Sequence, residues 1–261
     1  MLTPELEEAM PFDNLQQAWD QIYEKAQAGS LFCQYMIGNT YYWCDLVRIQ
    51  GRGPDDFENW EAFEAYMRNM TLECIPWFEK AFQGGLGIAG RNLYSLYSRG
   101  DKDTGIQPQK EKAEEVARQG AELGYPDWQC RYGLLLDRQE DRKEEAVSWL
   151  LKSVEQGHLE GCYELGLDYR NGTGTPKDLE KTKAYWELGT HWAEDTSCCE
   201  MLGYQYFAGV NDTPQDYARA VQLFELAVSR GGMWQAPLLA RCYLEGTGCM
   251  KDYSRAKWLL E

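Results

Sequence analysis

Residues 157–174 read GHLEGCYELGLDYRNGTG, and they are the clearest copy of a phrase that recurs along the chain. Gly157 is followed nine residues later by Gly166, twelve residues later by Tyr169 and fifteen residues later by Gly172. Similar spacing recurs in copies that begin at positions 29, 85, 124, 157, 194 and 231. A phrase that recurs at intervals of 33 to 56 residues is the signature of a repeat architecture.

A second phrase precedes the copies and ends on the opening position of the next one. Ala113, Ala146 and Ala220 each stand eleven residues before such a glycine. Apolar residues inside both phrases follow helical spacing, for example Val147, Leu150 and Val154. Each unit is therefore predicted to be a helix A, a short turn, a helix B and a second turn. Such a unit cannot bury its apolar face alone and stacks on its neighbours.

The glycines have two predicted roles. In the middle of helix A, a missing side chain lets two helices approach closely, which offsets the helix penalty of about 1 kcal/mol for glycine. After the tyrosine, glycines such as Gly172 end the helix and turn the chain. Copy two departs from the pattern with Tyr94 at the small-residue position, and copy three lacks its turn glycines. Both departures predict altered local packing within the same fold.

These residues resemble the Sel-one-like repeat (SLR) family, a relative of the tetratricopeptide repeats. The resemblance covers about residues 14–44 and 74–261. It is strongest at Gly166, Tyr169, Gly172, Gly174, Asp178, Lys181 and Trp186, and again at Tyr243, Gly246, Gly248, Asp252 and Trp258. It implies an all-α, right-handed superhelical solenoid of about six helix-turn-helix repeats, forming a single domain over residues 1–261. It also implies an adaptor or scaffold rather than an enzyme.

Copy one carries an insertion at about residues 45–73. Its first part, with Gly51 and Gly53, is a turn signal, and aromatic residues at 57, 60, 63 and 66 then follow helical spacing. Insertions in solenoids often lie on one face and bind partners. Two interpretations stay open: a connector that packs its aromatics back on the core, or a partner contact. The candidate partner-binding residues are Asp55, Asp56, Phe57, Glu58, Trp60, Glu61, Phe63 and Tyr66.

Most of the other aromatic residues occupy periodic core positions. Five tryptophans fall outside the core frame: Trp43, Trp60, Trp128, Trp192 and Trp234. Trp128 and Trp234 take similar places, four and three residues after the opening glycine. That similarity favours a shared structural role for these two over a binding role.

The charge excludes several classes of partner. The chain of 261 residues has 42 acidic and 26 basic residues, a formal net charge of −16. Residues 1–73 alone hold 13 acidic and 4 basic residues, a net of −9. Such a chain repels nucleic-acid backbones and anionic membranes, so the expected partner is a basic protein. No transmembrane helix is expected, because no run of about 18 apolar residues occurs.

The cysteines and the N-terminus predict a cytoplasmic protein. The sequence MLTPELEEAMPFDN has no basic start and no apolar run, so no secretory signal is expected. The nine cysteines are odd in number and unevenly spaced, which favours reduced thiols.

No catalytic residue, metal site or cofactor is predicted. The sequence has no CxxC motif, and His158 and His191 are its two histidines. His158 follows the repeat glycine and is interpreted as structural. A nucleophilic pair of His191 with Cys198 or Cys199 has nothing to specify its geometry.

The sequence thus predicts a non-enzymatic solenoid that binds a basic protein through its concave face, lined by the A helices, and through the insertion. A bacterial immunity protein that neutralises a toxin is a sharper version of this hypothesis. A general adaptor in signalling or secretion is the alternative, and a small-substrate hydrolase is a weaker one.

Overall fold

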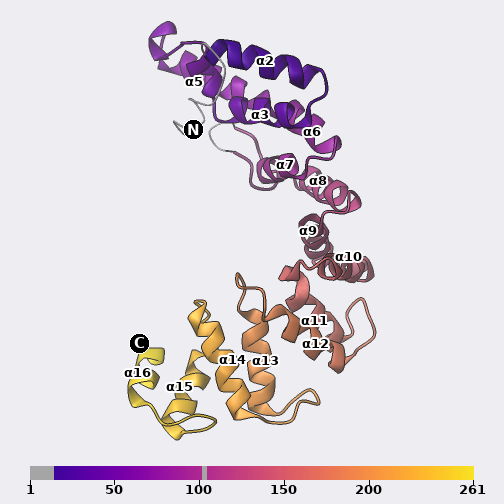
Figure 1. Cartoon of the computed structure of the whole chain (residues 1–261), viewed down its shortest axis with the longest axis vertical. Coiled ribbons are helices and arrows are strands. Elements are labelled where there is room, and N and C mark those ends of the chain that lie inside the picture. Colours follow the sequence, from indigo (N-terminus) through magenta and orange to yellow (C-terminus); the bar gives the residue numbers. More distant parts are fainter. Residues whose placement is uncertain (1–14, 102–104) are drawn as a thin grey trace. The chain divides into compact units, whose positions relative to one another are not determined.

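A computed structural model describes residues 15–101 and 105–261 of the chain (Figure 1). Within these residues all regular secondary structure is helical, apart from an isolated bridge between Asp101 and Ile106. The N-terminal segment 1–14, in which no secretory signal was expected, lies outside the described residues. The chain divides into two compact units, residues 1–123 and residues 124–261.

Unit 1 is built on two helix pairs, α3 with α6 and α7 with α8, and α2 packs against α3. Its elements are α2 (Leu15–Gln27), α3 (Leu31–Tyr42), α4 (Asp45–Ile49), η1 (Pro54–Asp56), α5 (Trp60–Leu72), α6 (Cys74–Gln83), α7 (Gly87–Arg99) and α8 (Lys110–Glu122). The segment from α4 to α5 interrupts the first pair, where the sequence predicts the insertion.

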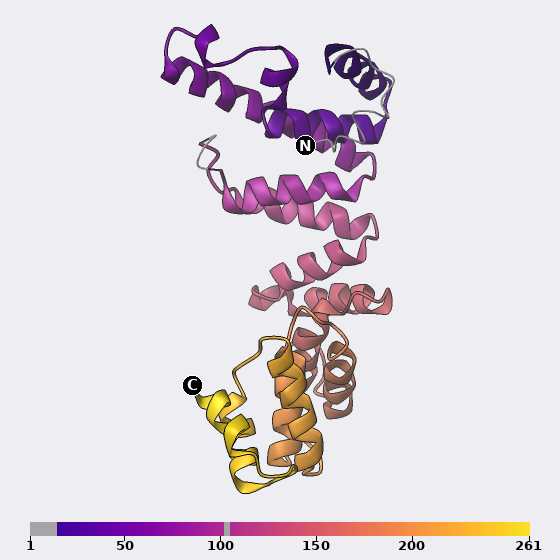
Figure 2. The same ribbon diagram turned by 60° about the vertical axis from the view of Figure 1, so that its left-hand side comes forward.

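Unit 2 contains four consecutive helix pairs, α9 with α10, α11 with α12, α13 with α14 and α15 with α16 (Figure 2). Its elements are α9 (Pro126–Leu136), η2 (Glu140–Arg142), α10 (Lys143–Glu155), η3 (Leu159–Gly161), α11 (Cys162–Asn171), α12 (Leu179–Gly189), α13 (Ser197–Ala208), α14 (Tyr217–Ser229), α15 (Ala236–Glu245) and α16 (Tyr253–Leu260).

Where helix A has a glycine in its middle, that glycine has the predicted packing role. A Cβ on Gly166 would lie only 2.0 Å from Nε1 of Trp186, the fully buried tryptophan of the paired helix α12. Gly38 meets Phe78 in the same way, and Gly203 meets Phe224. In copy two, where Tyr94 replaces the small residue, Gly90 one turn earlier lets α7 approach Phe82 of α6, the helix B of the preceding pair. Small residues therefore set the distance between helices A and B.

The turn from helix A to helix B uses two glycines and an aspartate. Gly172 adopts a positive φ of 74° and ends α11, as predicted. A Cβ on Gly174 would lie 2.4 Å from the carbonyl oxygen of Lys143, so this glycine lets the turn approach the start of α10. Asp178 caps α12 by accepting a hydrogen bond of 3.0 Å from the Lys181 amide.

Copy three replaces these glycines with a lysine contact. The Lys143 ammonium donates to the carbonyl oxygen of Asp137 at the end of α9, and its Nζ lies 3.1 Å from Oδ1 of the same residue. The last carbonyl of the helix is satisfied without a left-handed residue.

The predicted all-α solenoid of helix pairs is confirmed, with six pairs in the described residues.

Candidate functional site

The insertion lies between helices A and B of the first pair and packs mainly on α3 (Figure 1). It has a small core of its own, formed by Leu46, Val47 and Met70. Phe63 and Tyr66 pack against this core from α5. The start of the insertion is also held to α5, because the Cys44 thiol lies 3.1 Å from the Thr71 hydroxyl.

Three of the four candidate aromatic residues form one cluster around an arginine. The Phe57 ring lies 5.3 Å from Phe63 and 5.0 Å from Tyr66 between ring centroids. The Arg52 guanidinium stands 4.6 Å from the Phe57 centroid and 4.7 Å from the Tyr66 centroid, as in a cation–π contact. The Tyr66 hydroxyl donates to Gln50 Oε1 at 3.0 Å. These half-buried rings stabilise the insertion itself.

Trp60 differs from the other three because 61% of it is exposed. Its indole Nε1 donates to Glu64 Oε1 at 2.7 Å, and its ring lies 5.4 Å from Phe63. Glu58 and Glu61, its sequence neighbours, are exposed. The structure thus presents a large aromatic surface with carboxylates around it.

The acidic candidates Asp55 and Asp56 lie in η1 and are exposed. Asp56 Oδ2 accepts a hydrogen bond of 2.7 Å from the Gly53 amide, which shapes this turn. Helical spacing predicted a helix from position 57, but α5 begins at Trp60. The side chain of Asn59 accepts from the Ala62 amide at 2.8 Å and so caps the helix there.

Among the other tryptophans, the expected equivalence of Trp128 and Trp234 is wrong. Trp128 lies inside α9 and is 1% exposed, whereas Trp234 precedes α15 and is 64% exposed. The difference of one residue in spacing places one ring in the core and the other in solvent. Trp43 is also exposed, at 70%, and Trp192 is half-buried.

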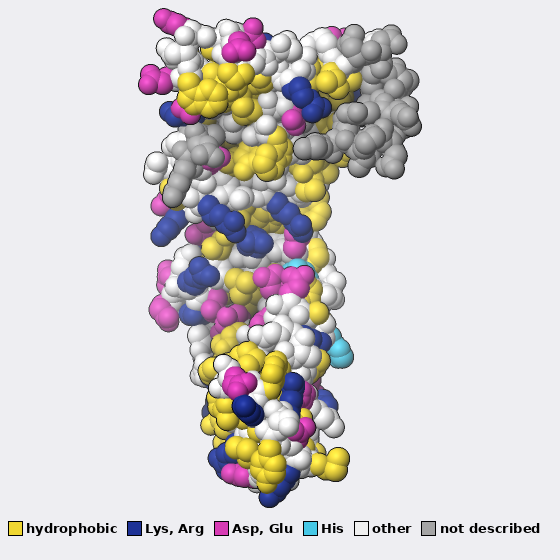
Figure 3. Space-filling model, turned by 90° about the vertical axis from the view of Figure 1, so that its left-hand side faces the viewer, with side chains coloured by type: hydrophobic (Ala, Val, Ile, Leu, Met, Phe, Trp, Pro, Cys, Tyr) yellow, Lys and Arg dark blue, Asp and Glu magenta, His cyan; other side chains and the backbone are white. Residues whose placement is uncertain are grey.

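Unit 2 contains a pocket of about 280 Å³ that the sequence analysis missed. Its lining comes from α9, η3, α11 and the segment before α13, and consists of Leu134, Glu160, Tyr163, Glu164, Trp192, Glu194 and Asp195. Four of these seven residues are carboxylates and two are aromatic, a lining that suits a cationic side chain. Acidic side chains gather beside a histidine on the face drawn in Figure 3. The signal in sequence was weak, because the acids come from separate repeats.

The carboxylates near this pocket are electrostatically strained. Burial raises the pKa of Glu164, and the charge of Asp137 raises it further. Asp168, one turn along α11, is 5% exposed, and burial followed by the charges of Asp137 and Glu164 raises its pKa to about 7. Among the described residues, Asp168 Oδ2 has no hydrogen-bond partner. Lys143 offsets part of this negative charge, and the remaining excess of carboxylates favours binding of a cation.

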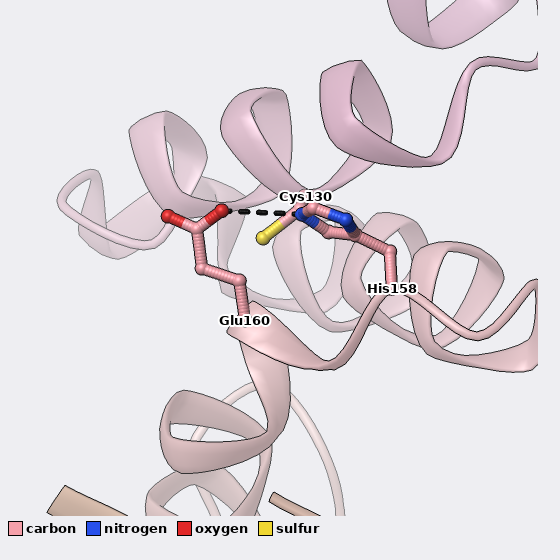
Figure 4. A group of neighbouring side chains, drawn as sticks. All are labelled: Cys130, His158 and Glu160. Atoms are coloured by element: carbon pink, nitrogen blue, oxygen red, sulfur yellow. Dashed lines mark hydrogen bonds and ion pairs between the residues drawn. The ribbon is translucent and has the colours of Figure 1, made fainter. Parts of the chain in front are cut away.

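The structure also brings together three potential metal ligands, although the sequence predicted no metal site. Cys130 lies in α9, while His158 and Glu160 lie at η3. One ligand atom from each residue lies within 4.8 Å of the other two. Figure 4 shows the Cys130 sulfur between the carboxylate and the imidazole. No sequence motif signals this group, because Cys130 and the His158–Glu160 pair belong to different repeats.

The thiols are poorly suited to nucleophilic chemistry. All nine cysteines are free, and Cys198 and Cys199 are buried while His191 is exposed. Burial raises the pKa of both thiols, Cys198 and Cys199. A thiol that stays protonated at neutral pH is a weak nucleophile.

Comparisons with known proteins place these features in a family. The sequence matches the Sel1 repeat at residues 129–158, 159–189, 196–232 and 238–261. A protective antigen of uropathogenic Escherichia coli with an SLR fold has a TM-score of 0.71 at 23% identity, covering 92% of this chain and 47% of that one. This chain therefore spans about half the length of that antigen. A Sel1 repeat protein from Oxalobacter formigenes has a TM-score of 0.65 at 22% identity, covering 94% of this chain and 92% of that one.

An immunity protein from Pseudomonas aeruginosa is more distant, with a TM-score of 0.46 at 20% identity over 100% of this chain and 85% of that one. No curated protein matches the sequence. Within the described part of the chain, no helix has the length and apolar character that crossing a membrane requires. At these identities, the first two structures share the SLR fold with this chain.

Proposed function

The chain belongs to the Sel1-repeat family, and from that premise we propose that it is a non-enzymatic solenoid that binds a basic protein. A Sel1-repeat solenoid fits a protein-binding role. The finer part of the proposal, a basic partner, follows from the net charge of −16 and from the places where carboxylates surround exposed aromatic side chains.

Trp60 is the observation that carries this proposal. A tryptophan that is 61% exposed leaves a large apolar surface in water, and tryptophan is the residue most enriched among binding hot spots. The rings of Phe57 and Tyr66 already make cation–π contacts with Arg52. We therefore assign them a supporting role beside Trp60 rather than a direct contact with the partner. Asp55, Asp56, Glu58 and Glu61 form the charged rim, with Phe63 beneath Trp60.

The pocket of unit 2 is the second proposed contact. Glu164, Glu194 and Asp195 supply negative charge, and Trp192 and Tyr163 supply ring surface. An arginine or lysine side chain of the partner satisfies both features. The pocket lies on the side of the A helices, α9 and α11, which agrees with binding through a face that these helices line.

We further propose a cytoplasmic immunity protein as the sharper version of this function. Nine free thiols fit a reducing compartment. A protein with 42 acidic residues can present carboxylates where a toxin such as a basic nuclease binds phosphates. The alternative is an adaptor in signalling or secretion, which has the same surface and a partner that is harmless alone.

The test is affinity capture from the native host with the full chain and two tryptophan variants. We expect a basic protein that leaves when the salt is raised, because exposed charges are screened. Trp60→Ala should weaken its binding by about tenfold or more. Trp234→Ala removes a tryptophan of similar exposure elsewhere and serves as the matched control.

The two versions separate in a second step. A partner that kills the host when expressed alone, and is harmless with this chain, supports the immunity role. A harmless partner supports the adaptor role. Equal loss of binding in both tryptophan variants, or an affinity that does not change with salt, contradicts the proposed contact.

A further inference from the structure

Cys130, His158 and Glu160 form a cluster that the protein-binding proposal does not use. The thiol comes from α9 and is fully buried, the imidazole is half-buried, and the carboxylate is exposed. His158 Nε2 lies 3.1 Å from Glu160 Oε2, and the three ligand atoms all lie within 4.8 Å of one another. The group thus runs from the core of unit 2 to its surface (Figure 4).

The positions of Cys130 and His158 are fixed by their surroundings. A Cβ on Gly161 would lie 2.9 Å from Leu150 Cδ2 and 3.6 Å from Cys130 Sγ, so this glycine lets η3 lie directly on α10 and α9. The His158 amide donates to the Ser153 carbonyl at 3.2 Å. The Trp192 ring packs against the imidazole in a T-shaped arrangement, with 5.1 Å between ring centroids.

The donor set matches zinc. A thiolate, an imidazole and a carboxylate are its usual ligands, at about 2.0–2.3 Å, whereas calcium and magnesium prefer oxygen ligands alone. Tetrahedral coordination at those lengths places ligand atoms about 3.3–3.8 Å apart. The present separations reach that range with side-chain shifts of about 1 Å, and the exposed Glu160 is free to make most of the movement.

The fourth coordination position has a natural opening. Glu160 also lines the acidic pocket of unit 2, where Glu164, Glu194 and Asp195 create a negative potential that attracts a divalent cation. We propose that Cys130, His158 and Glu160 bind one zinc ion, with the fourth position open to this pocket.

The proposal has a chemical requirement. Burial raises the pKa of the Cys130 thiol, and the charge of Glu160 raises it further, so the thiol is protonated in the absence of metal. Zinc displaces that proton and binds the thiolate, and the proton leaves to solvent through the pocket. The bond formed is zinc to sulfur, and no oxidant or reductant takes part.

Cobalt(II) titration of the full chain tests the site, in the presence of a phosphine reductant that keeps all nine thiols reduced. One equivalent should produce a thiolate-to-cobalt charge-transfer band and the intense visible absorption of a tetrahedral ion. One equivalent of zinc should then abolish both. His158→Gln should weaken binding about tenfold or more, because it removes a direct ligand.

His191→Gln is the matched control, since it changes the other histidine of unit 2, and it should bind like the parent chain. Cys130→Ala should remove the charge-transfer band, with Cys162→Ala as a control at another fully buried thiol. Because changes at buried cysteines risk unfolding, His158→Gln is the deciding variant, with circular dichroism to verify the fold. Absence of the band in the parent chain overturns the proposal, as does a band unchanged by His158→Gln.

Discussion

Single residues without side chains set the helix spacing in this solenoid, and Gly166 is the clearest case. Gly166→Ala places a methyl group within 2.0 Å of the Trp186 indole, whose Nε1 donates to the Tyr163 carbonyl at 3.1 Å. The ring must move and its hydrogen bond is lost, so we expect the free energy of unfolding to fall by about 1–3 kcal/mol. Urea titration measures this. Gly53→Ala, at a site with nothing within 4 Å, should change it by less than about 0.5 kcal/mol.

The contribution of Asp168 to stability should depend on pH, because its pKa of about 7 in the folded chain exceeds the ordinary value of 3.8. Between these values the folded state retains a proton that the unfolded state has lost. Its contribution to stability therefore falls as the pH rises through this window, and the full cost is present above about pH 7. Asp168→Asn removes the cost and should stabilise the chain by about 1–3 kcal/mol at pH 8 and by little at pH 4. An equal effect at both pH values contradicts this.

At the scale of elements, periodic features of the sequence were predictable and contacts between repeats were not. Spacing located the six helix pairs because most repeats reuse the small residue, the tyrosine and the glycine turn at the same intervals. The insertion was found because it breaks the period. The burial of Trp128 was not predicted, because the spacing does not show whether a residue lies inside the helix, as Trp128 does in α9, or before it, as Trp234 does at α15. The acidic pocket and the Cys130 cluster were missed because their side chains come from different repeats.

The insertion also shows how structure changes a prediction. If the Phe63 ring were exposed, Phe63→Ala would change only the binding of the partner. The ring instead packs against the core formed by Leu46, Val47 and Met70. Phe63→Ala should therefore loosen α5, increasing its amide hydrogen exchange by about five- to thirtyfold, from a local loss of about 1–2 kcal/mol. Trp60→Ala, on the same helix and mostly exposed, should leave exchange in α5 nearly unchanged. Equal exchange in the two variants would place Phe63 outside the core of the insertion.

For the whole molecule, we propose that residues 1–261 form one solenoid domain, although the chain clusters into two compact units. In repeat proteins each repeat is stabilised by its neighbours, so destabilising one repeat lowers the stability of the whole array. We expect a single calorimetric unfolding transition. Gly38→Ala in unit 1, which forces a methyl group to 2.6 Å from Phe78, and Gly166→Ala in unit 2 should each shift that whole transition to lower temperature. If two transitions appear and each variant shifts only one of them, the two units unfold independently. The reason is that a domain responds only to changes in the interactions that hold it together.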